Sequence, residues 1–197
     1  MQYRTLGKTG FNISAISLGT WQVGGKWGSA FNEKNAEAIL NEAVDNGVNL
    51  IDTADVYSDG ESEKAIGRFL KTRKEKLFVA TKCGRQIQPH VNEGYTPAVL
   101  RQYVEDSLKR LQVETLDLIQ LHCPPTAVFY RPEIFALFDE LKKEGKIQHL
   151  GVSVEKVEEA LKAIEFDNVT TVQIIFNLFR QRPAELFFEQ AKKKNIG

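Results

Sequence analysis

The sequence has little that would mark a secreted, metal-binding or nucleic-acid-binding protein. It contains two cysteines, Cys83 and Cys123, in 197 residues. Two cysteines cannot build a disulfide framework, and neither has the CxxC or histidine spacing of a zinc site. The 26 Lys and Arg residues equal the 26 Asp and Glu residues, so no excess charge favours nucleic acid or a membrane surface. We therefore expect no metal site and no nucleic-acid partner.

Long apolar runs are also missing. No segment approaches the ~18 apolar residues of a membrane-spanning helix, and the N-terminus has no apolar signal region. The glycine-rich loop from Gly19 to Gly28 lacks a phosphate-binding motif, because position 25 is Gly where a P-loop has Lys. These absences predict a cytoplasmic protein without membrane contact. With 42% hydrophobic residues, the chain can bury a sizeable core.

What the sequence does have is a regular alternation of strand and helix patterns after a predicted hairpin over residues 2–13. Pro97, Pro132 and Pro183 stand at the first positions of three of the expected helices. Six strand–helix units without a linker predict one domain over residues 1–197, with parallel strands joined by right-handed crossovers. The strands are expected at 15–18, 48–51, 77–81, 116–121, 148–152 and 171–175.

The stretch from Asn49 to Gly67 places an acid and a phenol where a buried strand ends. The apolar run stops at Asp52, Tyr57 follows in the loop, and Ser58 and Glu61 have the spacing of a capping box for the next helix. Ionisable groups in this position lie at an edge of the core, open to a ligand. The segment alone fits a second interpretation equally well, in which Asp52 caps a turn and Tyr57 is a half-buried aromatic residue.

Polar residues at the ends of successive strands decide between two α/β architectures. A doubly wound sheet and a (β/α) barrel both fit the strand–helix alternation. In a barrel the strand ends surround a single mouth, whereas an open sheet spreads them along an edge. We therefore predict a TIM-type (β/α) barrel with an N-terminal hairpin and about six of the eight βα units. The residues that favour it are Asp52, Lys82, His122, Ser153 and Gln173.

Four polar groups form a proton-transfer set. An unperturbed tyrosine has a pKa of ~10, which is poorly matched to neutral pH. We expect Lys82 beside Tyr57 to lower that pKa, and Asp52 to hold Lys82 through an ion pair. His122 is expected to donate a hydrogen bond to a substrate carbonyl oxygen or to relay the proton.

The segments around these residues resemble the aldo-keto reductase family. They are IDTADVY, FVATKCG and DLIQLHCP, with LGTW near the start and HLGVS and TVQ later in the chain. The resemblance implies that Asp52, Tyr57, Lys82 and His122 form the catalytic tetrad. It also implies that Tyr57 is the general acid when NADPH, or alternatively NADH, reduces a small aldehyde or ketone.

The same resemblance implies a cofactor site. Asp52, Ser153 and Gln173 would hold the nicotinamide end of the cofactor, and Thr20 and Trp21 would line the mouth. One departure concerns Val154, which follows Ser153 where many family members have Asn, so one contact to the carboxamide is missing or is made another way.

A second departure lies at Asn195-Ile196-Gly197, where the chain ends and the family's seventh strand would begin. In the family, the segments after that point grip the cofactor's phosphates. We therefore expect an aldo-keto reductase barrel domain that is incomplete at its C-terminus. Unpaired strand edges would make such a chain unstable or associated. An impaired fragment, or a binding relative without turnover, is the alternative to an active reductase.

Two smaller features each have two interpretations. Cys83 and Cys123 follow Lys82 and His122 on neighbouring strands, so they are a redox-sensitive pair or, as we expect, two buried free thiols. Trp21, Trp27 and Tyr95 suggest an aromatic-walled pocket, although ordinary packing explains them as well. The substrate itself is not predicted.

Overall fold

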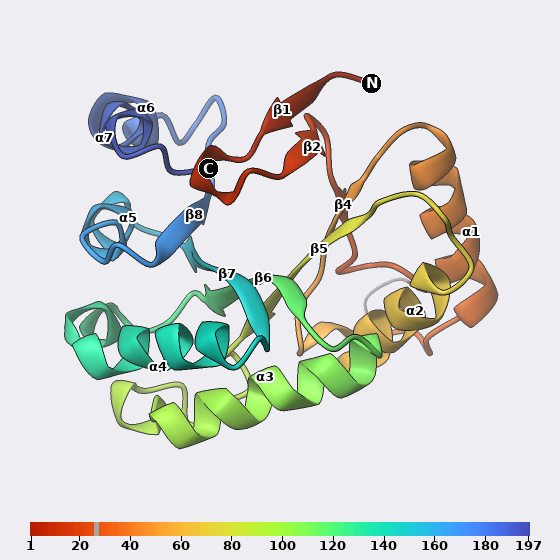
Figure 1. The fold of residues 1–197 in the computed structure, drawn as a ribbon, viewed down its shortest axis with the longest axis horizontal. Helices are drawn as coiled ribbons and strands as arrows, with labels where there is room; N and C mark the ends of the chain where they lie inside the picture. Colours follow the sequence, from red (N-terminus) through yellow and green to blue (C-terminus); the bar gives the residue numbers. More distant parts are fainter. Residues whose placement is uncertain (26–27) are drawn as a thin grey trace.

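The computed structural model describes residues 1–25 and 28–197 and has an α/β architecture (Figure 1). An antiparallel hairpin, β1 (Tyr3–Thr5) and β2 (Asn12–Ser14), precedes a curled sheet of six parallel strands. This confirms the predicted barrel-type fold with an N-terminal hairpin. The six strands pair in chain order, as β3 (Leu18–Gly19), β4 (Leu50–Asp52), β5 (Phe78–Cys83), β6 (Leu116–His122), β7 (Ile147–Val154) and β8 (Val169–Ile174).

The helices lie on the outer side of this curled sheet (Figure 1). None in the described ranges is long and apolar enough to cross a membrane. The helix predicted from Pro183 is divided in two, and Leu186, the last residue of the first part, is 45% exposed. The helices are α1 (Glu33–Asp45), α2 (Glu61–Leu70), α3 (Pro97–Leu111), α4 (Pro132–Lys143), α5 (Val157–Ala163), α6 (Arg182–Leu186) and α7 (Phe188–Lys193).

Local sequence signals explain where several helices begin. The Asn32 side chain accepts a hydrogen bond from the Asn35 N–H at α1, and the Thr96 hydroxyl accepts one from Val99 at α3. The capping box predicted at Ser58 is wrong. Helix α2 follows Gly60, whose φ is +84°, and within the described chain no side chain caps it. Ser58 lies instead in a left-handed turn with φ of 49°, so it does not reach the first turn of the helix.

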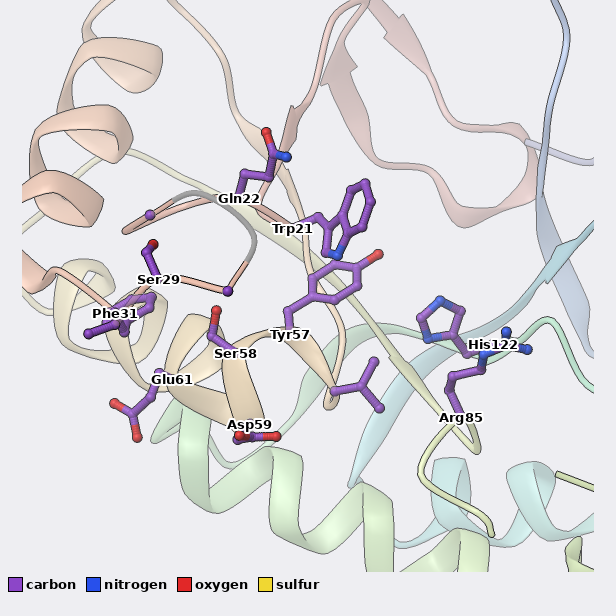
Figure 2. Close-up of a pocket in the computed structure, with 14 residues that line it drawn as sticks. Trp21, Gln22, Ser29, Phe31, Tyr57, Ser58, Asp59, Glu61, Arg85 and His122 are labelled. Atoms are coloured by element: carbon purple, nitrogen blue, oxygen red, sulfur yellow. The ribbon is translucent and has the colours of Figure 1, made fainter. Parts of the chain in front are cut away.

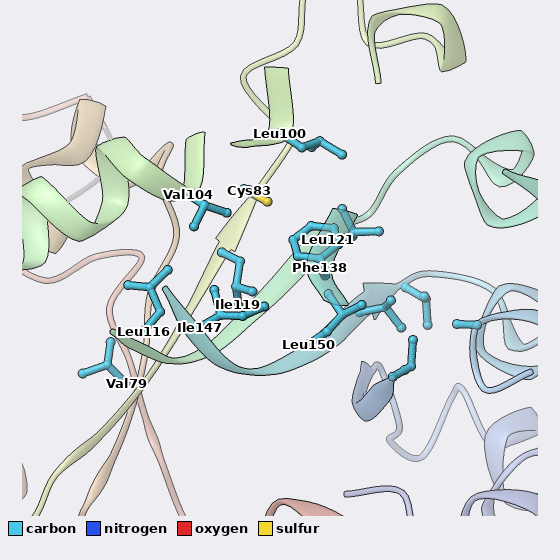
Figure 3. Close-up of a cluster of buried hydrophobic side chains, with 14 of the residues drawn as sticks. Val79, Cys83, Leu100, Val104, Leu116, Ile119, Leu121, Phe138, Ile147 and Leu150 are labelled. Atoms are coloured by element: carbon cyan, nitrogen blue, oxygen red, sulfur yellow. The ribbon is translucent and has the colours of Figure 1, made fainter. Parts of the chain in front are cut away.

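The main core lies between the outer face of the sheet and the helices (Figure 3). Alternate residues of each strand point to this side, because side chains alternate between the two faces of a strand. Burying each such side chain contributes roughly 1.5–3 kcal/mol. The residues concerned include Val79 and Cys83 of β5, Ile119 and Leu121 of β6, Leu100 and Val104 of α3, and Phe138 of α4.

The N-terminal hairpin covers the amino ends of the strands. Phe11 is buried and stacks on Phe78, the first residue of β5, with 4.4 Å between ring centroids. Its ring also meets the edge of His149 near the start of β7, at 4.9 Å. His149 therefore lies away from the carboxyl ends of the strands. With the amino ends covered, the carboxyl ends of the strands are the open side of the curled sheet.

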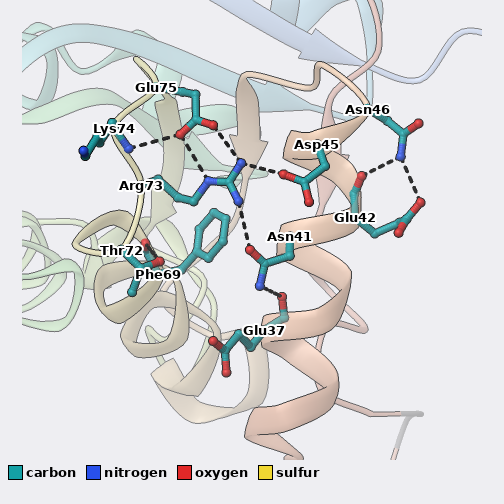
Figure 4. Close-up of polar contacts among 10 residues, drawn as sticks. All are labelled: Glu37, Asn41, Glu42, Asp45, Asn46, Phe69, Thr72, Arg73, Lys74 and Glu75. Atoms are coloured by element: carbon teal, nitrogen blue, oxygen red, sulfur yellow. Dashed lines mark hydrogen bonds and ion pairs between the residues drawn. The ribbon is translucent and has the colours of Figure 1, made fainter.

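A surface network fixes the approach to β5 (Figure 4). The Arg73 guanidinium donates to Asn41 and to Asp45 of α1, at 3.0 and 2.6 Å, and pairs with Glu75 at 2.8 Å. It also lies over the Phe69 ring of α2, 5.7 Å from the centroid. Exposed ion pairs contribute little singly, so this network mainly sets the geometry of the chain between α2 and β5.

Candidate active site

The predicted site residues meet at the carboxyl ends of the parallel strands. In the strand register, Ser153 of β7 stands opposite both His122 of β6 and Gln173 of β8. Asp52 is the last residue of β4, and Lys82 lies near the end of β5. The structure thus brings together residues that are up to 121 positions apart in the sequence. Parallel pairing causes this, because it aligns the ends of all strands on one side.

Lys82 is held by two oxygen atoms inside the curled sheet. Its ammonium lies 2.7 Å from the Asp52 carboxylate and donates a 2.8 Å hydrogen bond to the Thr53 carbonyl oxygen. The Lys82 side chain is only 2% exposed. A buried ammonium requires such ligands, because removing it from water unpaired would be very costly. Burial lowers the pKa of Lys82, and the charge of Asp52 counteracts this shift.

Tyr57 lies above this ion pair. The Lys82 ammonium is 5.2 Å from the centroid of the Tyr57 ring. The His122 ring meets the Tyr57 ring edge-on, with 6.0 Å between centroids and 84° between planes. Figure 2 shows the Tyr57 and His122 rings side by side at a cleft of about 880 Å³. Trp21 and Arg85 also line this cleft.

The predicted change in the acidity of Tyr57 is wrong in direction. Burial, followed by the negative charge of Asp52, raises the pKa of Tyr57 to about 12. The Lys82 ammonium, which is paired with the Asp52 carboxylate at 2.7 Å, does not outweigh this upward shift. Sequence position alone does not show how strongly the phenol is removed from water, and removal from water disfavours the phenolate.

His122 is neutral at physiological pH. Burial, followed by the positive charge of Lys82, lowers the pKa of His122 to about 3. Its Nδ1 atom is buried and has no hydrogen-bond partner among the described residues. A neutral imidazole can donate one hydrogen bond, which is what an uncharged carbonyl oxygen at this cleft would accept.

Thr20 lies beneath the mouth and does not line the cleft, contrary to our expectation, whereas Trp21 does line it. The Thr20 hydroxyl donates to the Asp52 carbonyl oxygen at 2.9 Å and accepts from Ser62 at 2.9 Å. Ser62 also contacts the Thr53 hydroxyl at 3.0 Å. These buried hydroxyls connect β3, β4 and α2, so they fix the backbone that carries Asp52.

Ser153 and Gln173 are the polar residues that fit the nicotinamide end of a cofactor. They are opposite each other in the register, beside His122. The Gln173 side chain is exposed, and in the described structure it has no hydrogen-bond partner. Its amide has both donors and an acceptor, which matches a carboxamide. Ser153 is 9% exposed, and its hydroxyl lies 3.6 Å from the Cys123 sulfur. Val154 is buried and offers no polar group.

The remaining predictions concern Tyr95, Trp27 and the two cysteines. Tyr95 is fully buried and donates to the Gly84 carbonyl oxygen at 3.0 Å, so it is a packing residue and does not line the cleft. Trp27 lies outside the described residues. Cys83 and Cys123 are both free, as expected, but only Cys83 is buried, because Cys123 is partly exposed. Within residues 1–25 and 28–197, no group of three or more His, Cys, Asp or Glu side chains could hold a metal ion.

Sequence reasoning missed two charged residues at the site. Asp55 is fully buried next to the turn that carries Tyr57, and its backbone N–H donates to the Lys82 carbonyl oxygen at 3.1 Å. Arg85 follows β5 and lines the cleft beside His122. Both were detectable in principle, because one lies between Asp52 and Tyr57 and the other lies three residues beyond Lys82.

Comparisons with known proteins identify the family of this chain. A family model described as the aldo/keto reductase family matches residues 15–197. The chain is 34% identical to aldo-keto reductase YhdN of Bacillus subtilis in an alignment of 203 residues, gaps included, that covers 100% of the chain and 60% of the relative. It is 30% identical to the NADH-specific methylglyoxal reductase of Escherichia coli, covering 88% of the chain and 58% of that protein.

Solved structures agree on the fold. The chain superposes on aldo-keto reductase AKR11C1 from Bacillus halodurans, in its holo form, with a TM-score of 0.87 and 28% identity, covering 100% of the chain and 64% of that structure. It also superposes on the glycerol dehydrogenase AKR11B4 from Gluconobacter oxydans with a TM-score of 0.78 and 35% identity. This superposition covers 94% of the chain and 58% of that structure. The chain thus spans about 60% of the length of the curated relative YhdN. It belongs to the aldo/keto reductase family.

Proposed function

We propose that this protein reduces an aldehyde or ketone to an alcohol, with Tyr57 as the general acid. The observation that carries the proposal is the placement of the Tyr57 and His122 rings at one cleft, above the buried Lys82–Asp52 ion pair. A carbonyl oxygen at this position would have a phenol and a neutral imidazole as its two hydrogen-bond donors. This arrangement polarises the carbonyl bond and supplies the proton that the product oxygen requires.

The role of Lys82 follows from the pKa of Tyr57. A phenol with a pKa of about 12 keeps its proton at neutral pH, so it releases the proton only as negative charge develops on the substrate oxygen. The Lys82 ammonium, 5.2 Å from the ring centroid, is placed to stabilise the phenolate that this transfer produces. Asp52 keeps the ammonium in position and balances its charge.

A bound nicotinamide cofactor, NADPH or alternatively NADH, would supply the hydride that attacks the carbonyl carbon. Asp52, Ser153 and Gln173 are the residues of this chain that would hold its nicotinamide end. The names of two relatives, an NADH-specific methylglyoxal reductase and a glycerol dehydrogenase, support carbonyl–alcohol chemistry. The free thiols of Cys83 and Cys123 fit a reducing compartment such as the cytoplasm.

The test is NADPH consumption with an aromatic aldehyde such as 4-nitrobenzaldehyde. We expect turnover by the purified protein and a loss of about 100-fold or more in Tyr57→Phe, because general acid catalysis contributes roughly 10²–10⁴-fold. Tyr130→Phe is the matched control, since Tyr130 is 65% exposed and does not line the cleft. Full activity in Tyr57→Phe would refute the role of the phenol. Cofactor binding without any turnover would instead favour a binding function.

A further inference from the structure

Arg85 introduces a positive charge into the cleft that holds the reacting groups. It lies just beyond β5 and lines the cleft together with Tyr57 and His122. Figure 2 shows its side chain extending toward His122. The charge of Arg85 also acts on that imidazole, because it lowers the pKa of His122 further, after burial and Lys82. The guanidinium therefore faces the place where a substrate carbonyl would bind.

The Arg85 guanidinium has no counterion in the described structure. Six other arginines form ion pairs there, and Arg85 forms neither an ion pair nor a side-chain hydrogen bond. Glu155 and Glu159 line a neighbouring hollow with it, but Glu159 accepts from the Thr126 hydroxyl at 2.6 Å and lies 3.8 Å from the Lys156 ammonium. Arg85 is thus an unneutralised cation in a concave site.

The rest of the cleft suits the uncharged part of an organic acid. Trp21, Phe31 and Val56 supply apolar wall, and Asp59 and Glu61 line the part of the cleft away from Arg85 (Figure 2). A single guanidinium neutralises one carboxylate through two parallel hydrogen bonds. A phosphate dianion would need more positive charge than one arginine supplies, and the two acidic residues would repel it.

We propose that Arg85 selects carbonyl substrates that carry a carboxylate, so that the substrate class is an aldehyde or keto acid. The carboxylate pairs with the guanidinium, and the carbonyl group lies between Tyr57 and His122. The reaction is the reduction proposed above. A hydride from the nicotinamide cofactor adds to the carbonyl carbon, a proton from Tyr57 adds to the carbonyl oxygen, and the carboxylate takes no part. The inference rests on the proposed function, since it assigns the substrate of the same site.

The test compares 4-carboxybenzaldehyde with its methyl ester, which has the same aldehyde and nearly the same shape but no charge. The 3-carboxy isomer and its methyl ester test a second distance between the carboxylate and the aldehyde. We expect the purified protein to prefer the acid in kcat/KM. We expect Arg85→Gln to reduce that acid-to-ester ratio about tenfold, mainly through KM of the acid, because a charge-assisted pair is lost. Arg85→Lys should keep part of the preference.

Arg180→Gln is the matched control, because Arg180 is exposed and lies outside the cleft, so its acid-to-ester ratio should equal that of the parent protein. Calorimetric binding of the acid and the ester gives a second measurement that needs no turnover. If neither aldehyde is reduced, the proposed function fails, and the binding ratio alone decides the role of Arg85. Equal preference for acid and ester, or a preference that survives in Arg85→Gln, would overturn this inference.

Discussion

At the scale of single residues, the least expected group is the Asp55 carboxyl. It is fully buried, and among the described residues neither of its oxygens has a hydrogen-bond partner that meets normal geometry. Burial, followed by the negative charge of the buried Glu63, raises the pKa of Asp55 to about 7, while Arg110 counteracts the shift. Glu63 itself is satisfied, since it pairs with Arg110 at 2.5 Å and accepts from the Thr81 hydroxyl. The Asp55 carboxyl, behind the turn that carries Tyr57, therefore lowers the stability of the folded state when it is ionised.

This arrangement predicts a dependence of stability on pH. The pKa of Asp55 rises from 3.8 in the unfolded chain to about 7 on folding, so the folded state binds the proton more tightly. The free energy of unfolding must then fall as pH rises from about 4 to about 7, and stay level above that. Three pH units set an upper limit of about 4 kcal/mol on this loss.

Asp55→Asn removes the charge and should be more stable than the parent protein at pH 8, with a smaller difference at pH 5. Urea denaturation at both values measures it. Asp139→Asn is the control, because Asp139 is exposed, and should change stability by less than about 0.5 kcal/mol. A gain in Asp55→Asn that does not grow between pH 5 and pH 8 would contradict the buried-charge explanation.

At the scale of elements, the contact between α2 and α3 depends on the absence of a side chain. A Cβ atom at Gly67 of α2 would lie 2.5 Å from the Leu111 carbonyl oxygen and 2.8 Å from that of Arg110. Both are backbone atoms at the end of α3, so no side-chain rotation can relieve the overlap. The helices approach closely here, and Arg110 thereby reaches Glu63 of α2.

Gly67→Ala should therefore destabilise the protein by about 1–3 kcal/mol. Alanine gains roughly 1 kcal/mol of helix propensity over glycine, but the backbone overlap outweighs this gain. Thermal denaturation followed by circular dichroism measures the change. Gly19→Ala is the control for the unfolded chain, because no described atom lies within 4 Å of its Cβ position. If Gly67→Ala is as stable as Gly19→Ala, the close approach of the helices does not matter for stability.

At the scale of the whole molecule, a group of apolar side chains between β8 and α7 faces solvent. Leu178 is 84% exposed and Phe179 is 96% exposed. Ile175, Phe176, Leu186 and Phe188 are between 38% and 50% exposed. Phe176 and Phe188 meet edge-on with 5.0 Å between ring centroids, and exposed apolar side chains that gather in this way favour association. The backbone of Gly197 also forms hydrogen bonds with Thr170 and Val172, so this residue pairs along β8.

We expect the protein to associate with itself as its concentration rises from low to high micromolar. The double variant Leu178→Ser with Phe179→Ser should reduce the average mass measured by sedimentation at the highest concentration. Val91→Ser is the control, because Val91 is 41% exposed elsewhere on the molecule. A monomer at every concentration would show that this surface does not drive association.

The sequence by itself determined the order and type of the elements. Apolar spacing and the prolines at helix starts are local properties, so all six strands and the helices that follow them are found in their predicted order. The polar residues that end the strands were predictable for the same reason. Asp52, Lys82, His122, Ser153 and Gln173 meet at one side because parallel pairing aligns strand ends.

Only the tertiary structure decided the pKa values at the site and the backbone conformation of the turn at Ser58. The pKa of Tyr57 rises because segments distant in sequence exclude water from it, and no pattern within the chain reports that exclusion. The turn at Ser58 adopts left-handed angles that a capping pattern does not reveal. Asp55 and Arg85 look alike as charged loop residues in the sequence. Packing buries the first and leaves the second facing the cleft, since burial depends on contacts between elements and not on residue type.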